Sequence, residues 1–167
     1  EVWLGETGHA LYGGEPGVSD RFIAGLWWVD HLGLMARSGV RLVVRQSLVG
    51  GEYALLDSDT FAPRPDYWNS LLWKRLMGEQ VYAAECEGAS RLRVYVHDTP
   101  NVQGAISFLL INLDLRSEIR VTLDRSTLGF APRWFEIYSV TASEPFSEHL
   151  SINGMPPDLP EQRDLPP

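Results

Sequence analysis

The sequence predicts an α/β segment (1–79), then an antiparallel all-β segment (80–155) and an irregular tail (156–167). Up to residue 78, short apolar runs of β-favouring residues alternate with longer stretches of helical periodicity, which is typical of parallel α/β folds. From residue 81 onward, short β-favouring runs follow one another between turn-forming stretches, as in a β-sandwich. The tail is polar and rich in proline, which predicts no regular structure.

The first βα unit begins with a short apolar run at 2–4, which predicts a buried strand. Ser19 and Asp20 are predicted to cap a helix that extends to about Ser38 and stops at Gly39. Apolar side chains cover much of the circumference of that helix. We therefore expect it to be buried on more than one side.

The second βα unit consists of an apolar run at 40–46, a long loop at 47–65 and a helix that Asp66 is predicted to cap and Gly78 to end. Two such units cannot close a barrel, because closure needs about eight strands. We therefore expect them to be the last two βα units of a (β/α)8 barrel, with the strands that complete it upstream of Glu1.

The all-β segment is predicted to form an antiparallel sandwich from six runs, at 81–87, 91–97, 105–113, 118–123, 134–140 and about 150–154. The single cysteine, Cys86, falls in the first of these runs, so we expect it to be a small buried hydrophobe. One cysteine excludes an internal disulfide and a cysteine-based metal cluster.

The composition excludes several classes of function. Hydrophobic residues make up 44% of the chain, enough for a core, and the formal net charge is −8. An acidic surface argues against nonspecific nucleic-acid binding. No apolar run approaches the ~20 residues of a membrane span. The histidines are scattered, and no phosphate-binding glycine loop, zinc-protease helix or serine elbow occurs. We expect neither a metal nor a cofactor.

Two polar side chains are predicted to meet where neighbouring strands end. Glu6 follows the first apolar run, and Gln46 ends the second. The working residues of parallel α/β folds lie at the carboxyl ends of strands. A carboxylate at the exit of a buried strand is costly unless it has a partner or a task. Glu6 is therefore either a catalytic group or a residue that caps or salt-bridges the loop after it.

The loops after these two runs carry glycine pairs, Gly13–Gly14 and Gly50–Gly51. Backbone amides at such pairs can hold a carboxylate, and Tyr53 can add a hydroxyl donor. These features favour recognition and cleavage of a polar ligand. We expect His9 to be polar surface, and the tryptophans of the two helices to pack in the core rather than stack on sugars.

The first fourteen residues, Val2-Trp3-Leu4-Gly5-Glu6-Thr7 and then Tyr12-Gly13-Gly14, resemble the nucleophile segment of the heparanases of glycoside hydrolase family 79. The resemblance extends over most of the chain, densely to Met77 and thinly after it. The further segments that carry it most clearly are Val18-Ser19-Asp20, Ala24-Gly25-Leu26-Trp27-Trp28, Leu32-Gly33-Leu34, Val44-Arg45-Gln46, Gly51-Glu52-Tyr53, Pro65-Asp66-Tyr67-Trp68 and Ser70-Leu71-Leu72-Trp73-Lys74-Arg75-Leu76.

The resemblance implies that Glu6 is the nucleophile of a retaining endo-β-glucuronidase that cleaves heparan sulfate. It also implies six substrate-binding residues: Tyr12, Gly13, Gly14, Gln46, Gly51 and Tyr53. Among them, Gly13, Gly14 and Tyr53 would hold the carboxylate of the uronic acid. A place in the extracellular matrix or the lysosome, with membrane association, follows from the same resemblance.

Retaining hydrolysis needs a second carboxylic acid, which protonates the leaving oxygen. In the family this Glu follows an Asn, and no Asn-Glu pair occurs in this sequence. We therefore expect the acid/base residue in the upstream part of the same protein, and residues 1–167 alone to be inactive. Two alternatives stay open: a non-catalytic glycosaminoglycan-binding protein, and an exo-β-glucuronidase that acts on another glycan.

Overall fold

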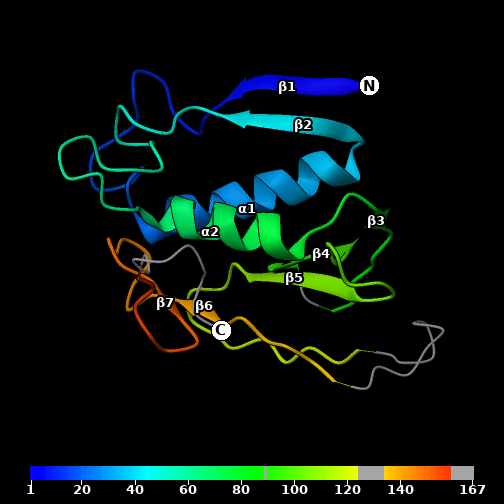
Figure 1. Ribbon diagram of the computed structural model, residues 1–167. Coiled ribbons are helices and arrows are strands. Elements are labelled where there is room, and N and C mark those ends of the chain that lie inside the picture. Colours follow the sequence, from blue (N-terminus) through cyan, green and yellow to red (C-terminus); the bar gives the residue numbers. More distant parts are fainter. Residues whose placement is uncertain (89, 124–133, 159–167) are drawn as a thin grey trace.

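The computed structural model describes residues 1–88, 90–123 and 134–158, which form three layers (Figure 1). The upper layer is a parallel pair of strands, β1 (Val2–Thr7) and β2 (Val40–Arg45). Its register places Thr7 opposite Arg45. The helix between the strands in the chain lies beneath them, so the predicted strand–helix–strand unit with parallel strands is confirmed.

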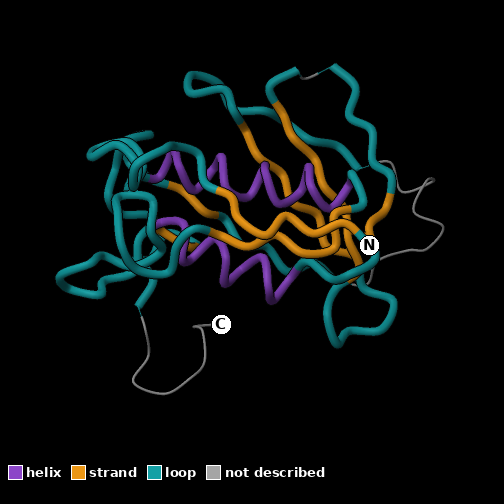
Figure 2. The backbone as a smooth tube through the Cα atoms, turned by 90° about the horizontal axis from the view of Figure 1, so that it is seen from above, coloured by secondary structure: helices purple, strands orange, loops and turns teal. Residues whose placement is uncertain are grey.

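The middle layer consists of α1 (Phe22–Arg37) and α2 (Pro65–Leu76). The two helices run side by side in the same direction, opposite to that of β1 and β2 (Figure 1). Seen from above, the strands of the upper layer run along the two helices, with one helix on either side of them (Figure 2). This is the arrangement expected of two consecutive βα units.

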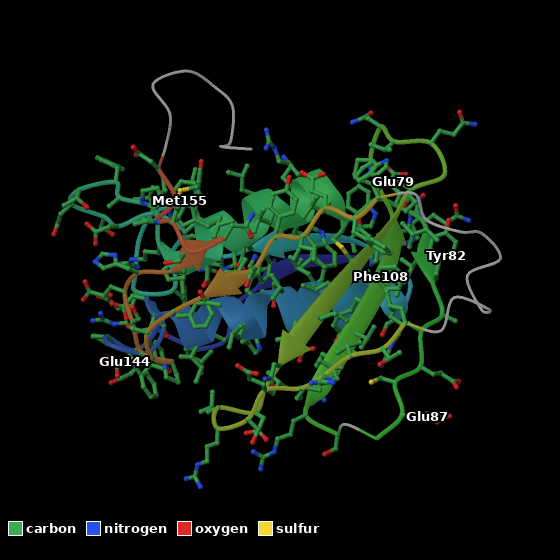
Figure 3. The ribbon with its side chains drawn as sticks, turned by 90° about the horizontal axis from the view of Figure 1, so that it is seen from below. Glu79, Tyr82, Glu87, Phe108, Glu144 and Met155 are labelled. Carbon is green, nitrogen blue, oxygen red and sulfur yellow. The ribbon has the colours of Figure 1, made fainter. Side chains whose placement is uncertain are left out.

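The lower layer is antiparallel and lies on the other side of the helices. Its described strands are β3 (Val81–Tyr82), β4 (Leu92–Asp98), β5 (Ile106–Asn112), β6 (Val140–Thr141) and β7 (Ser151–Ile152). They form one sheet in the order β3-β4-β5 and a separate pair, β6-β7. Figure 3 shows this face from below, with Tyr82 on β3 and Phe108 on β5.

Two apolar clusters join the helices to the lower layer. In the first, Phe22, Trp68 and Leu150 bring the beginnings of both helices against the β6-β7 pair. In the second, Val29 packs against Tyr95 and Ile111 of β4 and β5. The prediction that the first helix is buried on more than one side is confirmed, because α1 contacts both layers and α2.

Two glycines allow α1 its close contacts. A Cβ atom on Gly33 would lie 2.4 Å from ring atoms of Tyr95, and one on Gly25 would lie 2.5 Å from Nδ2 of Asn69. Gly33 therefore lets the aromatic ring of β4 reach the helix backbone. Gly25 likewise lets the side chain of Asn69, in α2, approach the backbone of α1. Trp28 and Trp68 are buried among these elements as predicted, whereas Trp27 and Trp73 are half-buried.

The predicted helix caps are wrong, although the helices are right. The N-cap residue of α1 is Arg21, without a side-chain cap. The amides of Phe22 and Ile23 instead donate to the carbonyls of Ser147 and Pro145, over 2.9 and 2.8 Å. In α2, Asp66 lies in the first turn after Pro65, with its side chain buried. Distant backbone thus satisfies the first amides of α1, which any helix leaves free.

The first strand is not buried as predicted. Val2 is 62% exposed and Trp3 is 64% exposed. Helix α1 covers one face of the β1-β2 pair, and Leu42 and Val44 are also exposed. Burial of both faces of a parallel sheet needs cover on both sides. The described part of this chain provides it on one side.

The lower layer contains less strand than the sequence predicted. The run at 118–123 forms no strand, and of 134–140 only Val140 is in one. In the run at 81–87, only Val81 and Tyr82 form a strand. Cys86 is exposed, so the prediction that it is buried is wrong. β-propensity makes a strand only where a neighbour pairs with it, and none does so here within the described residues. Of the predicted tail, residues 159–167 lie outside the described part.

The (β/α)8 barrel, the sandwich and the domain boundary at 79–80 stay predictions, because sheets of two and three strands neither close nor stack into either architecture. None of the described helices combines the length and the apolar character that crossing a membrane requires.

Candidate functional site

A cavity of about 340 Å³ lies at the carboxyl ends of β1 and β2. The residues that line it are Glu6, Thr7, Gly8, Ala10, Leu11, Tyr12, Gln46 and Tyr53. Four of the predicted site residues, Glu6, Tyr12, Gln46 and Tyr53, therefore meet in one hollow. Gly13, Gly14 and Gly51 are not part of its lining.

The strand register brings Glu6 and Gln46 together. Thr7 pairs with Arg45, and the amide of Gln46 donates to the carbonyl oxygen of Thr7 over 2.9 Å. The side chain of Glu6 is exposed in the described structure, and none of the ion pairs found there includes it. The alternative in which Glu6 only salt-bridges its loop therefore gains no support from the described residues.

The glycine pairs hold the two site loops against each other. The amide of Tyr53 donates to the carbonyl of Gly13 over 3.1 Å, and that of Gly14 donates to Leu11 over 3.2 Å. A Cβ atom on Gly51 would lie 2.6 Å from the oxygen of Gly13. Close approach of backbone to backbone is what requires glycine here. Tyr12, beside Gly13, is fully exposed with φ of +54°.

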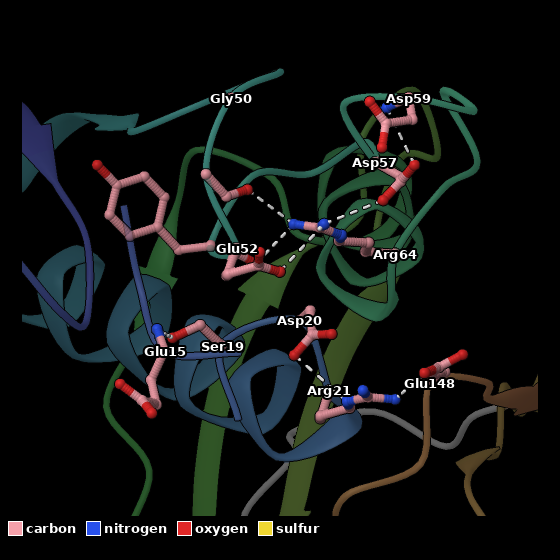
Figure 4. Close-up of polar contacts among 12 residues, drawn as sticks. Glu15, Ser19, Asp20, Arg21, Gly50, Glu52, Asp57, Asp59, Arg64 and Glu148 are labelled. Atoms are coloured by element: carbon pink, nitrogen blue, oxygen red, sulfur yellow. Dashed lines mark hydrogen bonds and ion pairs between the residues drawn. The ribbon is translucent and has the colours of Figure 1, made fainter. Parts of the chain in front are cut away.

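Arg64, which no sequence pattern had indicated, holds the loop after β2 in place through contacts with three of its residues (Figure 4). Its Nη1 donates to the carbonyls of Gly51 and Glu52 over 2.8 and 2.7 Å, and its Nη2 contacts the carboxylates of Glu52 and Asp57. One guanidinium therefore holds the segment that leads into Tyr53. Its signal in the sequence is an arginine just before a helix and after three acidic loop residues, two of which it contacts.

The same loop is closed by Asp57. Its Oδ1 accepts hydrogen bonds from the amide and the hydroxyl of Thr60, over 2.9 and 2.8 Å, and from the amide of Asp59. These bonds, those from Thr60 first, lower the pKa of Asp57 to about 2. Hydrogen bonds to the ionised form of a carboxyl favour that form.

A buried ion pair lies beneath the loop. Arg45 pairs with Asp66, and their side chains are 6% and 3% exposed. Burial raises the pKa of Asp66 to about 7 against the opposing charges of Arg45 and Arg64, and burial lowers the pKa of Arg45. The guanidinium carbon of Arg45 lies 4.7 Å from the ring centroid of Trp28, a cation–π distance. Asp66 thus serves this pair rather than a helix cap.

His9 is not the surface residue that the sequence predicted. Its ring centroid lies 5.0 Å from that of Trp27, and both ring nitrogens are buried without a hydrogen-bond partner among the described residues. His31 stacks on the same tryptophan at 5.0 Å. Burial first, and then the charge of Arg45, lower the pKa of both histidines. Both therefore favour the neutral form.

Over residues 1–88, 90–123 and 134–158, no group of three or more His, Cys, Asp or Glu side chains could hold a metal ion. The chemistry that this cavity offers is that of one carboxylate among an amide, two phenols and backbone groups.

Known proteins similar to this chain are heparanases and glucuronidases, while no protein-family model matches it. Heparanase-like protein 1 of Arabidopsis thaliana is 46% identical over 72% of the chain and 22% of its own length. Baicalin-beta-D-glucuronidase of Scutellaria baicalensis is 39% identical over 77% of the chain and 24% of its own length. Heparanase of Bos taurus is 51% identical over 59% of the chain and 18% of its own length.

The chain therefore spans less than a quarter of the length of these three relatives. Over that part, it is a relative of the heparanases and heparanase-like proteins.

Proposed function

We propose that this relative of the heparanases supplies the nucleophile and part of the sugar-binding surface of a retaining, glucuronide-cleaving glycosidase. The observation that carries the proposal is the cavity at the ends of β1 and β2, which Glu6 lines together with Gln46, Tyr12 and Tyr53. A carboxylate of a glycosidase must be open to the sugar, and Glu6 is exposed in that cavity.

In the proposed mechanism, the ionised carboxylate of Glu6 attacks the anomeric carbon while the bond to the leaving oxygen breaks. A carboxylic acid about 5–5.5 Å away gives its proton to that oxygen, and then takes one from the water that releases the sugar from Glu6. We assign this second carboxyl to the upstream part of the same protein. Residues 1–167 by themselves are then expected to show no turnover.

The uronic acid carboxylate is proposed to meet Tyr53 and the backbone of the Gly13–Gly14 and Gly51 loops, with Gln46 at the same sugar. No Lys or Arg is among the described residues that line the cavity. A full positive charge beside a carboxylate nucleophile would reduce its basicity. A phenol and amides can bind a carboxylate without that cost.

The exposed side of the β1-β2 pair supports the proposal that a barrel is completed upstream. Trp3, Leu42 and Val44 are exposed there, and clustered apolar surface of this kind is unusual on an isolated soluble domain. Upstream strands would cover it, and the lower layer would belong to the sandwich.

Heparan sulfate is the proposed substrate, cleaved at internal bonds of the polysaccharide. The likeness to a protein named baicalin-beta-D-glucuronidase favours a second candidate, removal of a terminal glucuronic acid from a small glucuronide. An aryl β-D-glucuronide and heparan sulfate, offered separately to the full-length protein, distinguish the two. Binding of the glycan without cleavage of either substrate would favour the non-catalytic alternative.

The test of the mechanism is Glu6→Gln in the full-length protein, which keeps size and polarity but removes the nucleophile. Glu15→Gln is the matched control, because Glu15 is exposed in the same loop and does not line the cavity. We expect Glu6→Gln to abolish turnover with an unchanged circular dichroism spectrum, and Glu15→Gln to keep it. Retained activity in Glu6→Gln, or a first-formed product of inverted configuration by proton NMR, would contradict the proposal.

A further inference from the structure

A closed set of contacts beneath the site links Arg45 to a residue of the cavity lining. Nη2 of Arg45 donates to the carbonyl oxygen of Tyr53 over 2.8 Å and to the carboxylate of Asp66. The amide of Tyr53 donates to Gly13. Both backbone polar groups of Tyr53 are therefore held, one by the first site loop and the other by the end of β2.

The support beneath Arg45 is itself tied to Asp66. The backbone carbonyl of Asp66 accepts the hydroxyl of Ser70 over 2.7 Å, and the oxygen of Ser70 accepts the indole N–H of Trp28 over 2.8 Å. The ring of Trp28 in turn carries the guanidinium. The contacts thus run in a circle through β2, α2 and α1, and hold the guanidinium of Arg45 between the ring of Trp28 and the carboxylate of Asp66.

A salt bridge this deeply buried is poor evidence for stability alone. Removing two charges from water costs several kcal/mol per ion, so apolar side chains of similar volume often do as well. The geometry of Arg45 suits a task besides stability, because its hydrogen bonds to the described residues all leave from Nη2, and one of them ends on Tyr53, which lines the cavity.

We propose that Arg45 is a positioning residue of the glucuronide site, which fixes the backbone of Tyr53 so that its phenol stays beside Glu6 and Gln46. This inference rests on the proposed function. It assigns Arg45 no contact with the substrate, since Arg45 is not in the lining of the cavity.

Arg45→Lys tests this, because lysine keeps the charge opposite Asp66 but lacks the planar group that stacks on Trp28. Loss of one well-placed hydrogen bond to the substrate corresponds to about tenfold in binding. We expect KM for an aryl β-D-glucuronide to rise about tenfold with kcat within about twofold, since the carboxylate is bound in ground and transition states alike. In a Tyr53→Phe background, which lacks the phenol hydroxyl, Arg45→Lys should leave KM unchanged.

Arg21→Lys is the matched control, because Arg21 is an ion-paired arginine at the start of α1, as Figure 4 shows, and lies outside the cavity lining. It should leave KM and kcat unchanged. If Arg45→Lys lowers only the melting temperature, or raises KM equally in the Tyr53→Phe background, the positioning role is refuted. Should Arg45→Lys not fold, Asp66→Asn, which leaves Arg45 in place, is expected to give a smaller rise in KM with the same dependence on Tyr53.

Hydrogen exchange separates this inference from the proposed function. If the wild-type protein turns over no glucuronide, the proposed function fails, while exchange in the peptide over 47–57 still reports on the loop. Faster exchange there in Arg45→Lys, but not in Arg21→Lys, supports the positioning of the loop by Arg45. Equal exchange in all three proteins overturns it.

Discussion

Replacing Gly51 by alanine would push apart the two loops that carry the proposed sugar-binding residues. A Cβ atom on Gly51 would lie 2.6 Å from the carbonyl oxygen of Gly13 and 2.9 Å from its Cα atom. Both are backbone atoms, so they cannot rotate away as a side chain could. Gly51 also has φ of +81°, in the region that disfavours residues with a Cβ atom.

Gly50 allows the two costs to be separated. Its φ is +105°, and a Cβ atom there would meet none of the described atoms within 4 Å. Positive φ costs alanine about 1–2 kcal/mol at either position. Overpacking adds a further cost of about 1–3 kcal/mol at Gly51 alone. We therefore expect Gly51→Ala to lower the free energy of unfolding by about 2–5 kcal/mol, and Gly50→Ala by about 1–2 kcal/mol.

Equilibrium urea unfolding of the full-length protein, followed by tryptophan fluorescence, measures both changes, and equal m-values make them comparable. The aryl glucuronide assay adds a functional measure, because separation of the loops should raise KM in Gly51→Ala more than in Gly50→Ala. Equal destabilisation by the two substitutions would show that the loops are not in backbone contact, and would refute the reasoning from Gly13.

The remaining predictions concern other parts of the chain. Alanine normally stabilises a helix relative to glycine by up to about 1 kcal/mol, but the ring of Tyr95 leaves it no room at Gly33, so Gly33→Ala should instead destabilise by about 1–3 kcal/mol. A higher melting temperature of Gly33→Ala would contradict this. Asp57 has a pKa of about 2 instead of 3.8, so its contribution to stability is complete above pH 3.8 and is lost as the pH falls through 2. Asp57→Asn should therefore lower the melting temperature at neutral pH, and the melting temperature of this variant should fall less than that of the wild type as the pH is lowered through 2. The same dependence of melting temperature on pH in both proteins would show that the hydrogen bonds of Asp57 contribute nothing to stability.

The local pattern of the sequence was enough to predict the βαβα order and the meeting of Glu6 with Gln46. Residues 2–4 and 40–46 favour strands, and apolar periodicity marks the helices between and after them. Gly39, with φ of +82°, follows the end of α1 at Arg37 as predicted. Parallel strands joined by a helix align their carboxyl ends, so adjacency of the two side chains follows from chain order alone.

Contacts between distant segments decided what the sequence pattern could not. Asp66 is of a residue type that often caps helices and lies at the start of one, yet its carboxylate pairs with Arg45, twenty-one positions earlier in the chain. Segment 145–147 satisfies the first amides of α1, where Ser19 and Asp20 were predicted to do so. His9 packs against the ring of Trp27 instead of lying on the surface. The run at 118–123 has no pairing partner in the described structure. Local propensity specifies which conformations a segment prefers, but the partner of a buried charge, a free amide or a strand edge is chosen only when the layers pack.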